Sequence, residues 1–217
     1  MRTRKILYRY HIWSLIRHFI ILYVILVCTG CAAVIKPQVS SSEFLNTDEK
    51  KPGTIHLYVS EAFRAHKEVK QDISELKEWT FELGPVSIDT FRFALESRFT
   101  DVSVKLGEPV FPIKNPGGFF AVVRPEFTSF LASDPVLFKF EDYKAEIGFS
   151  VDIYNADGIV ILSKKYVGKG VKQGAIGYED PGHAAYPVAI QTAVTDAVNQ
   201  IVTDLLNIAD TTDKVAY

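Results

Sequence analysis

"YKAEIGFSVDIYNADGIVILSKKYVGK", residues 143–169, is the most regular part of the sequence. Over residues 143–153, apolar side chains alternate with polar residues or glycine, which is the period of a strand with one buried and one wet face. Asn-Ala-Asp-Gly at 155–158 is typical of a turn, and residues 159–169 lead the chain back. Because strands of parallel sheets rarely have a wet face, this stretch predicts an antiparallel hairpin.

A long amphipathic helix is predicted downstream, over residues 186–207. Its apolar stripe recurs at steps of three and four and consists of Ile190, Val194, Ala197, Ile201, Leu205 and Ile208. The helix lacks Lys and Arg, which argues against a role at a membrane surface. Residues 168–183, between the hairpin and this helix, are rich in glycine and are predicted to form a loop.

The remaining elements lie upstream of the hairpin. We expect strands over residues 54–60, 76–83, 101–106 and 119–131, and a helix over residues 86–99. Pro125 within the last of these strands predicts an edge strand or a bulge. The predicted fold class is therefore α+β, with a single mixed or antiparallel sheet and the long C-terminal helix packed on one face.

The N-terminal segment has the parts of a secretory signal. Its basic residues, with no acidic residue among them, are Arg2, Arg4, Lys5, Arg9 and Arg17. Ten uncharged residues follow from Phe19 to Cys28, about half of the ~20 apolar residues that span a bilayer. The small residues Thr29 and Gly30 come next, so a cleaved signal is predicted over residues 1–30. An uncleaved signal anchor is the alternative.

Cys28-Thr29-Gly30-Cys31 resembles the lipobox of bacterial lipoproteins, although Cys28 stands where that family usually has Leu. The resemblance implies cleavage before Cys31, which would then carry the acyl chains, palmitate among them. Several chains anchor a protein stably, whereas one chain binds only reversibly. Ala32 follows the cysteine, which by the same resemblance favours the periplasmic face of the outer membrane over the inner membrane.

Processing also changes the composition. The chain has 24 basic and 26 acidic residues, and the signal holds five of the basic ones, which leaves 19 against 26, a net charge of −7. Such an acidic chain is a poor nucleic-acid binder. Acylation of Cys31 would leave no cysteine for a disulfide or a metal site. The predicted division is a signal (1–30), a flexible tether (31–53), an α/β domain (54–208) and a C-terminal tail (209–217).

Few side chains indicate a catalytic or metal-binding function. His56, His66 and His183 lack the spacing of metal ligands, and no catalytic motif occurs, so we expect no cofactor, no metal and no enzymatic activity. Lysines do gather at the end of the hairpin. Lys165, Lys169 and Lys172 are predicted as an anionic-contact patch for a lipid headgroup, a glycan or an acidic partner. A solvated strand end is the alternative.

Three stretches carry a second resemblance: VSIDTFRFALESRFTDVSV (86–104), YKAEIGFSVDIYNADGIVILSKKYVGKG (143–170) and AIQTAVTDAVNQIVTDLL (189–206). Their order resembles the uncharacterised YajG type of envelope lipoproteins and, more loosely, small lipoproteins of lipopolysaccharide and curli export. The resemblance implies a lipid-anchored periplasmic accessory protein that contacts a partner protein or an envelope polymer. The alternative is a periplasmic hydrolase of envelope glycan or lipid, using carboxylates such as Glu141, Asp142, Glu179 and Asp180.

Overall fold

A computed structural model of the chain describes residue 17 and residues 32–44, 49–72, 77–114, 118–133, 142–173 and 181–215. Cys31 and, except for Arg17, the predicted signal lie outside the described residues. The chain divides into two compact units, residues 1–33 with 70–79 and residues 34–69 with 80–217. The predicted domain boundaries remain predictions.

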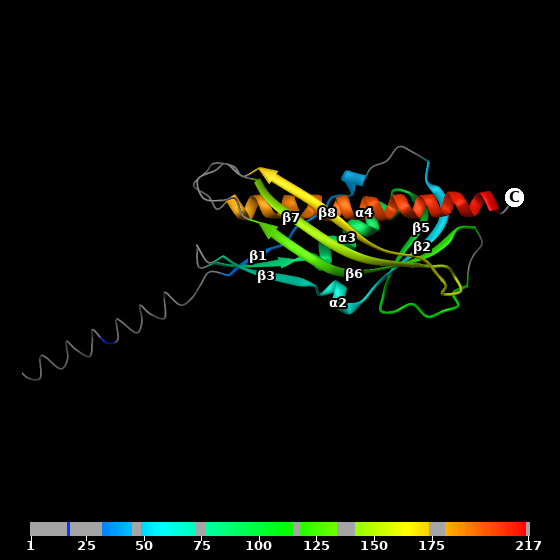
Figure 1. The fold of residues 1–217 in the computed structure, drawn as a ribbon, viewed down its shortest axis with the longest axis horizontal. Coiled ribbons are helices and arrows are strands. Elements are labelled where there is room, and N and C mark those ends of the chain that lie inside the picture. Colours follow the sequence, from blue (N-terminus) through cyan, green and yellow to red (C-terminus); the bar gives the residue numbers. More distant parts are fainter. Residues whose placement is uncertain are drawn as a thin grey trace, which may run out of the picture. The chain divides into compact units, whose positions relative to one another are not determined.

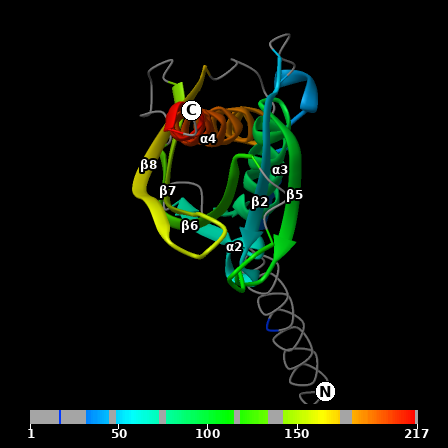
Figure 2. The same ribbon diagram turned by 90° about the vertical axis from the view of Figure 1, so that its right-hand side faces the viewer.

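The second unit holds a five-stranded mixed sheet (Figure 1). Its strands are β2 (Lys51–Val59), β5 (Phe99–Leu106), β6 (Phe120–Ser133), β7 (Asp142–Tyr154) and β8 (Val160–Gln173), in the spatial order β5-β2-β6-β7-β8. β2 runs parallel to both β5 and β6, whereas β7 is antiparallel to β6 and to β8. Figure 2 shows the five strands curving around the helices, so that the concave face is buried.

The predicted hairpin is confirmed as β7 and β8. Phe149 pairs with Tyr166, and side chains of β7 alternate between buried and half-buried or exposed positions along most of the strand. The turn is held locally, because the side-chain oxygen of Asn155 accepts hydrogen bonds from the amides of Asp157 and Ile159. Gly158 follows with a φ of +85°, a conformation that glycine adopts without strain.

Of the two outcomes predicted from Pro125, an edge strand or a bulge, β6 has the bulge. The strand is internal, between β2 and β7, and is not an edge strand. β2 pairs with β6 only as far as Val123, so Pro125 needs no hydrogen bond on that side. The predicted bulge is present, because the register with β7 shifts between Phe127 and Ser129.

The prediction of a single sheet is wrong. A second sheet of three strands contains β1 (Ala32–Ile35), β3 (Lys67–Asp72) and β4 (Lys77–Glu82), in the order β1-β4-β3. We expected β4 as a strand but missed the other two, because β1 has four residues and β3 reads KEVKQD, in which only one side chain is apolar. The fold remains α+β overall.

The ranges predicted as tether and tail contain regular secondary structure. β1, a 3-10 turn at Ser41–Phe44 (η1) and the start of β2 lie in the range 31–53. The C-terminal helix α4 (Pro181–Val215) continues beyond residue 208. Its apolar stripe extends to Ala209, which is fully buried, although the surrounding Asp and Thr residues resemble a tail.

The short helix α2 (Glu61–Arg64) and the helix α3 (Leu83–Glu96) meet closely. The Ser60 side chain caps α2 by accepting a hydrogen bond from the Phe63 amide. A Cβ atom at Gly84 would lie 2.1 Å from the carbonyl oxygen of Arg64, so only glycine fits there. α3 starts at Leu83, before the predicted Val86.

α4 packs on β7 and β8, as predicted for the C-terminal helix. Two glycines that we assigned to a loop lie in β8 and allow this contact. A Cβ at Gly168 or Gly170 would lie 1.9 Å from the carbonyl oxygen of Ala193 or Ala189, respectively, so the helix backbone approaches the strand directly. No helix among the described residues has the length and apolar character needed to cross a membrane.

Candidate functional site

The candidate site lies on the outer face of the sheet, the face turned away from α3 and α4. Side chains of a strand alternate between the two faces. In β8, Tyr166, Gly168 and Gly170 are buried on the side of α4, so Lys165 and Lys169 point to the outer face.

The structure does not bring the three predicted lysines together. Lys172 shares the alternation of Gly170 and is paired with the buried Tyr143, so it lies on the helix side. Lys165 and Lys169 do share one face, opposite Ser150 and Glu146 of β7. The predicted patch therefore consists of two lysines on one face and one on the other.

Lys144 of β7, and not Lys172, lies on the outer face with Lys165 and Lys169. It is exposed and lies opposite Val171 of β8 on the outer face. Among the residues that the structure describes, neither Lys144 nor Lys165 forms an ion pair, whereas the ammonium of Lys169 lies 3.6 Å from a carboxylate oxygen of Glu146. Two positive charges on this face are thus not neutralised by a described neighbour.

A shallow depression of about 240 Å³ lies at the end of this face, and we call it the outer-face groove. Its lining comes from all three antiparallel strands: Leu131, Ser133, Lys144, Ala145, Glu146, Lys169, Gly170 and Val171. Leu131 and Val171 keep 63% and 51% of their surface exposed. The groove thus offers aliphatic side chains beside two ammonium groups and one carboxylate, a surface suited to an anionic, partly apolar partner.

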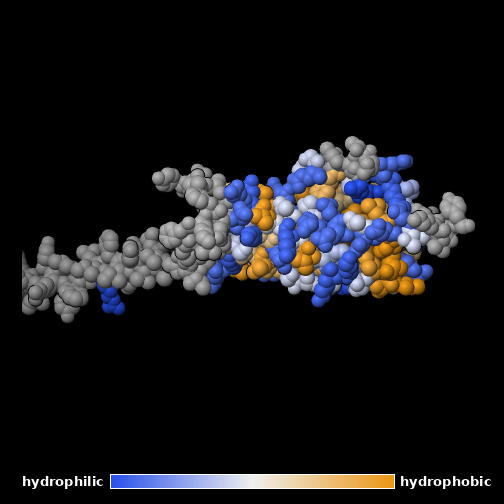
Figure 3. All heavy atoms as spheres, turned by 45° about the horizontal axis from the view of Figure 1, so that its top comes forward, coloured by the Kyte–Doolittle hydropathy of each residue, from blue (hydrophilic) through white to orange (hydrophobic). Residues whose placement is uncertain are grey.

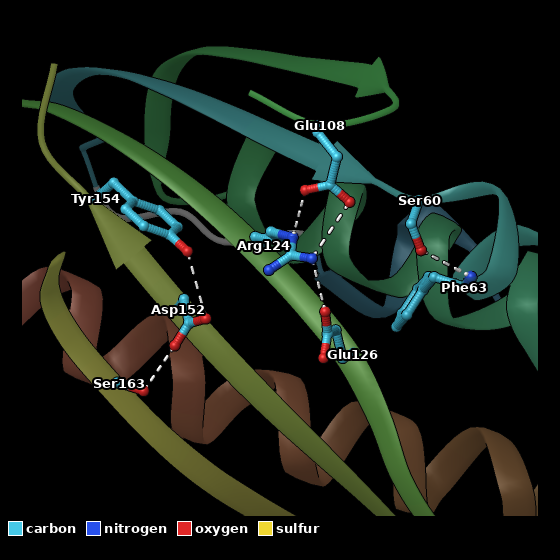
Figure 4. A network of polar contacts seen from close by, with 8 residues as sticks. All are labelled: Ser60, Phe63, Glu108, Arg124, Glu126, Asp152, Tyr154 and Ser163. Atoms are coloured by element: carbon cyan, nitrogen blue, oxygen red, sulfur yellow. Dashed lines mark hydrogen bonds and ion pairs between the residues drawn. The ribbon is translucent and has the colours of Figure 1, made fainter. Parts of the chain in front are cut away.

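A polar network occupies the other end of the outer face (Figure 4). The Nε of Arg124 lies 2.8 Å from a carboxylate oxygen of Glu108, and its Nη2 lies 2.8 Å from Glu126. Tyr154 and Ser163 both donate to the carboxylate of Asp152, at 3.4 and 2.6 Å. The Arg124–Glu108 pair joins the segment after β5 to the sheet, and the charged groups here are largely paired.

Lys164, also in β8, holds α4 in place. Its ammonium donates to Asp204 at 2.8 Å, and the hydroxyl of Tyr166 donates to the same oxygen at 2.8 Å. The bond from Lys164 keeps the pKa of Asp204 below its ordinary value, with a smaller contribution from Tyr166 that burial opposes. Burial, followed by the bond to Asp204, raises the pKa of Tyr166 well above its ordinary value.

His56 and His66, the two histidines whose side chains the structure describes, lie in different surroundings. Burial lowers the pKa of His56, and Lys105 lowers it further against the effect of Asp101. His66 stacks on Phe127 with ring centroids 4.0 Å apart. The side chain of His183 is outside the described part of the structure. Within the described ranges, no group of three or more His, Cys, Asp or Glu side chains is placed to hold a metal.

The acidic residues of the hydrolase alternative fall mostly outside the described chain. Glu141, Glu179 and Asp180 lie in undescribed segments, and Asp142 starts β7. Sequence reasoning missed Lys144, Leu131 and Val171 as a group. Alternation could have placed Lys144 and Val171 on the wet face, but Leu131 joins them only through the register after the bulge in β6.

No protein-family model matches the chain, and no curated protein matches it. A Xanthomonas campestris protein described by the family-model DUF330 has a similar structure, with a TM-score of 0.51 at 12% identity over 85% of this chain and 99% of that one. A Caulobacter crescentus protein described provisionally as a lipoprotein gives a TM-score of 0.37 at 11% identity, over 58% and 83% of the two chains. A hypothetical protein from Chlamydia trachomatis gives 0.44 at 12%, over 71% and 96%.

The first of these likenesses shows a shared fold and nothing about activity, because the identity is only 12%. The other two have TM-scores below 0.5 and carry no argument. None of the three is described as YajG-like, so that resemblance remains a prediction.

Proposed function

We propose that this chain is a non-enzymatic accessory protein of the bacterial envelope that binds an anionic, partly apolar partner segment or polymer in the outer-face groove. The observation that carries the proposal is the groove itself. Leu131 and Val171 supply exposed aliphatic surface, and Lys144 and Lys169 place two ammonium groups beside it. In the proposal, the partner takes part in envelope assembly or transport.

The cellular location in this proposal is based on the N-terminal sequence. Cleavage before Cys31 and acylation of that cysteine would anchor the chain at the periplasmic face of the outer membrane. The net charge of −7 after processing supports the groove as the place where an anionic partner binds. Most of the surface would repel such a partner, and the groove would not.

Photo-crosslinking in cells that produce the full chain tests the proposal. A photoreactive residue at Val171 lies in the groove, and one at Lys172 lies on the opposite face of the same strand. We expect Val171 to yield a discrete adduct that the control does not, and the double variant Lys144→Gln with Lys169→Gln to reduce it. Equal adducts from both positions, or none from Val171, would contradict a partner in the groove.

Salt provides the second measurement. The adduct should form less efficiently in isolated membranes as salt rises from about 0.1 M to about 1 M, because the Debye length falls from about 10 Å to about 3 Å. The variant Lys172→Gln is the matched control and should leave the adduct unchanged. A yield that does not depend on salt would contradict the role of the lysines.

A further inference from the structure

The two edges of the five-stranded sheet are treated differently. β8 forms one edge, and side chains of α4 cover it. The side-chain amide of Gln200 donates to the backbone carbonyl of Val167, and the backbone N–H of Lys169 donates to the carboxylate of Asp196. β5 forms the other edge and lies at the margin of the unit in Figure 2. An uncovered edge strand exposes backbone groups that can pair with another chain.

The backbone direction of β5 follows from a hydrogen bond at its end. The amide of Gly107 donates to the carbonyl of Val59 in β2, at 2.9 Å. Because the backbone groups of successive strand residues point to opposite sides, odd-numbered residues of β5 face β2. The N–H and C=O groups of Val102 and Val104 therefore point to the free edge.

The sequence of this edge complements itself. Residues 101–105 read Asp-Val-Ser-Val-Lys. If two copies pair antiparallel about a two-fold axis at Ser103, Asp101 of each lies opposite Lys105 of the other, and Val102 lies opposite Val104. No pair of like charges meets in this register.

The side chains that such pairing would use are accessible. Asp101 and Lys105 are exposed, and among the described residues neither forms an ion pair, although Asp101 accepts a hydrogen bond from Thr54 at 3.2 Å. Leu106, at the end of the strand, keeps 62% of its surface exposed. An edge that combines two valines with one acidic and one basic side chain is complementary to a second copy of itself.

We infer that the chain forms a two-fold dimer in which β5 pairs antiparallel with β5 of a second copy. The two sheets then become one continuous sheet, with backbone hydrogen bonds between Val102 of each copy and Val104 of the other. The dimer does not depend on the proposed function, because the outer-face groove lies on β6, β7 and β8, away from β5.

Charge reversal tests this pairing. The full chain in detergent is measured by sedimentation equilibrium over a wide range of protein concentration, at a matched detergent density. We expect a dimer for the original chain. Asp101→Lys and Lys105→Asp each place like charges opposite one another twice and should each raise the dissociation constant on the order of tenfold. The double variant restores both opposite-charge pairs and should restore the dimer.

A second variant tests the backbone. Val102→Pro removes an N–H that points to the free edge, which a folded monomer tolerates but a paired strand does not. We expect a monomer whose thermal melting is close to that of the original chain, and melting curves of all variants serve as controls for folding. A monomeric original chain would overturn the inference. So would a dimer that survives Val102→Pro, or a double charge variant no better than the single ones.

Discussion

Gly168→Ala should destabilise the chain far more than the gain of one methyl group suggests. The new Cβ would lie 1.9 Å from the carbonyl oxygen of Ala193, and 2.6 Å and 2.9 Å from the backbone N and the Cβ of Ala197. Ordinary contacts of a Cβ begin near 3.4 Å. α4 would therefore have to move away from β8 by more than an ångström, and it is held there along several turns.

The expected cost follows from overpacking in a rigid core, which is about 1–3 kcal/mol. For a chain of this size, each kcal/mol lowers the melting temperature by about 2–4 °C, so we expect a fall between about 2 and 12 °C. Thermal unfolding followed by circular dichroism measures it. Lys169→Ala is the matched control, because Lys169 is the exposed neighbour on the same strand, and it should shift stability by no more than about 0.5 kcal/mol.

The double variant Gly168→Ala with Ala193→Gly distinguishes a backbone contact from a side-chain contact. The closest atom belongs to the backbone of Ala193, so removal of its methyl group should not restore stability. Glycine inside a helix should instead lower stability further, by about 1 kcal/mol. An unchanged melting temperature in the single variant, or recovery in the double one, would refute the direct approach of helix and strand.

Three more outcomes are expected. Because the pKa of Asp204 is lowered in the folded state, its contribution to stability is present above about pH 4 and is lost as the pH falls through the folded pKa; Asp204→Asn should flatten the acid side of a plot of melting temperature against pH, and an unchanged slope would contradict this. Cys31→Ser should abolish labelling by radioactive palmitate and leave the precursor unprocessed, whereas equal labelling would end the lipoprotein prediction. Ile201→Asp should cost several kcal/mol in denaturant unfolding, because Ile201 is fully buried; a small loss would show that the helix is not docked at this position.

The parts of the fold that sequence alone predicted are those with a sustained period. Residues 143–153 alternate without interruption, and the stripe of α4 repeats over several turns, so both elements were found with the correct partner. β3 was missed because charged side chains occupy most of its positions. A strand whose stability comes from its neighbours in a sheet has little local signal of its own.

The candidate site was predicted in part for a related reason. Lysines of the hairpin were visible in the sequence, but their faces depend on where the strand continues. We predicted the returning strand only as far as Lys169, whereas β8 runs to Gln173 and its alternation places Lys172 on the helix side. Gly168 and Gly170 do not mark a loop; they make room for α4. Glycine in a strand can mark a close backbone approach as well as a break.

The protection of the β8 edge explains why the lysines of this strand do not form a single surface patch. A long edge strand needs protection from unwanted pairing, and charged side chains and a covering helix are two ways to provide it. β8 has both, because Lys164 is bound to Asp204 and the backbone at Val167 and Lys169 is bound by side chains of α4. The ion pair with Asp204 accounts for the charge of Lys164 without any ligand. The charge that remains for a partner is on the outer face, and the edge that remains for a second copy is β5. A dimer through β5 would carry two outer-face grooves on one continuous sheet. A partner with repeated anionic groups could occupy both grooves. Its affinity would then rise through the effective concentration at the second groove and not through new contacts.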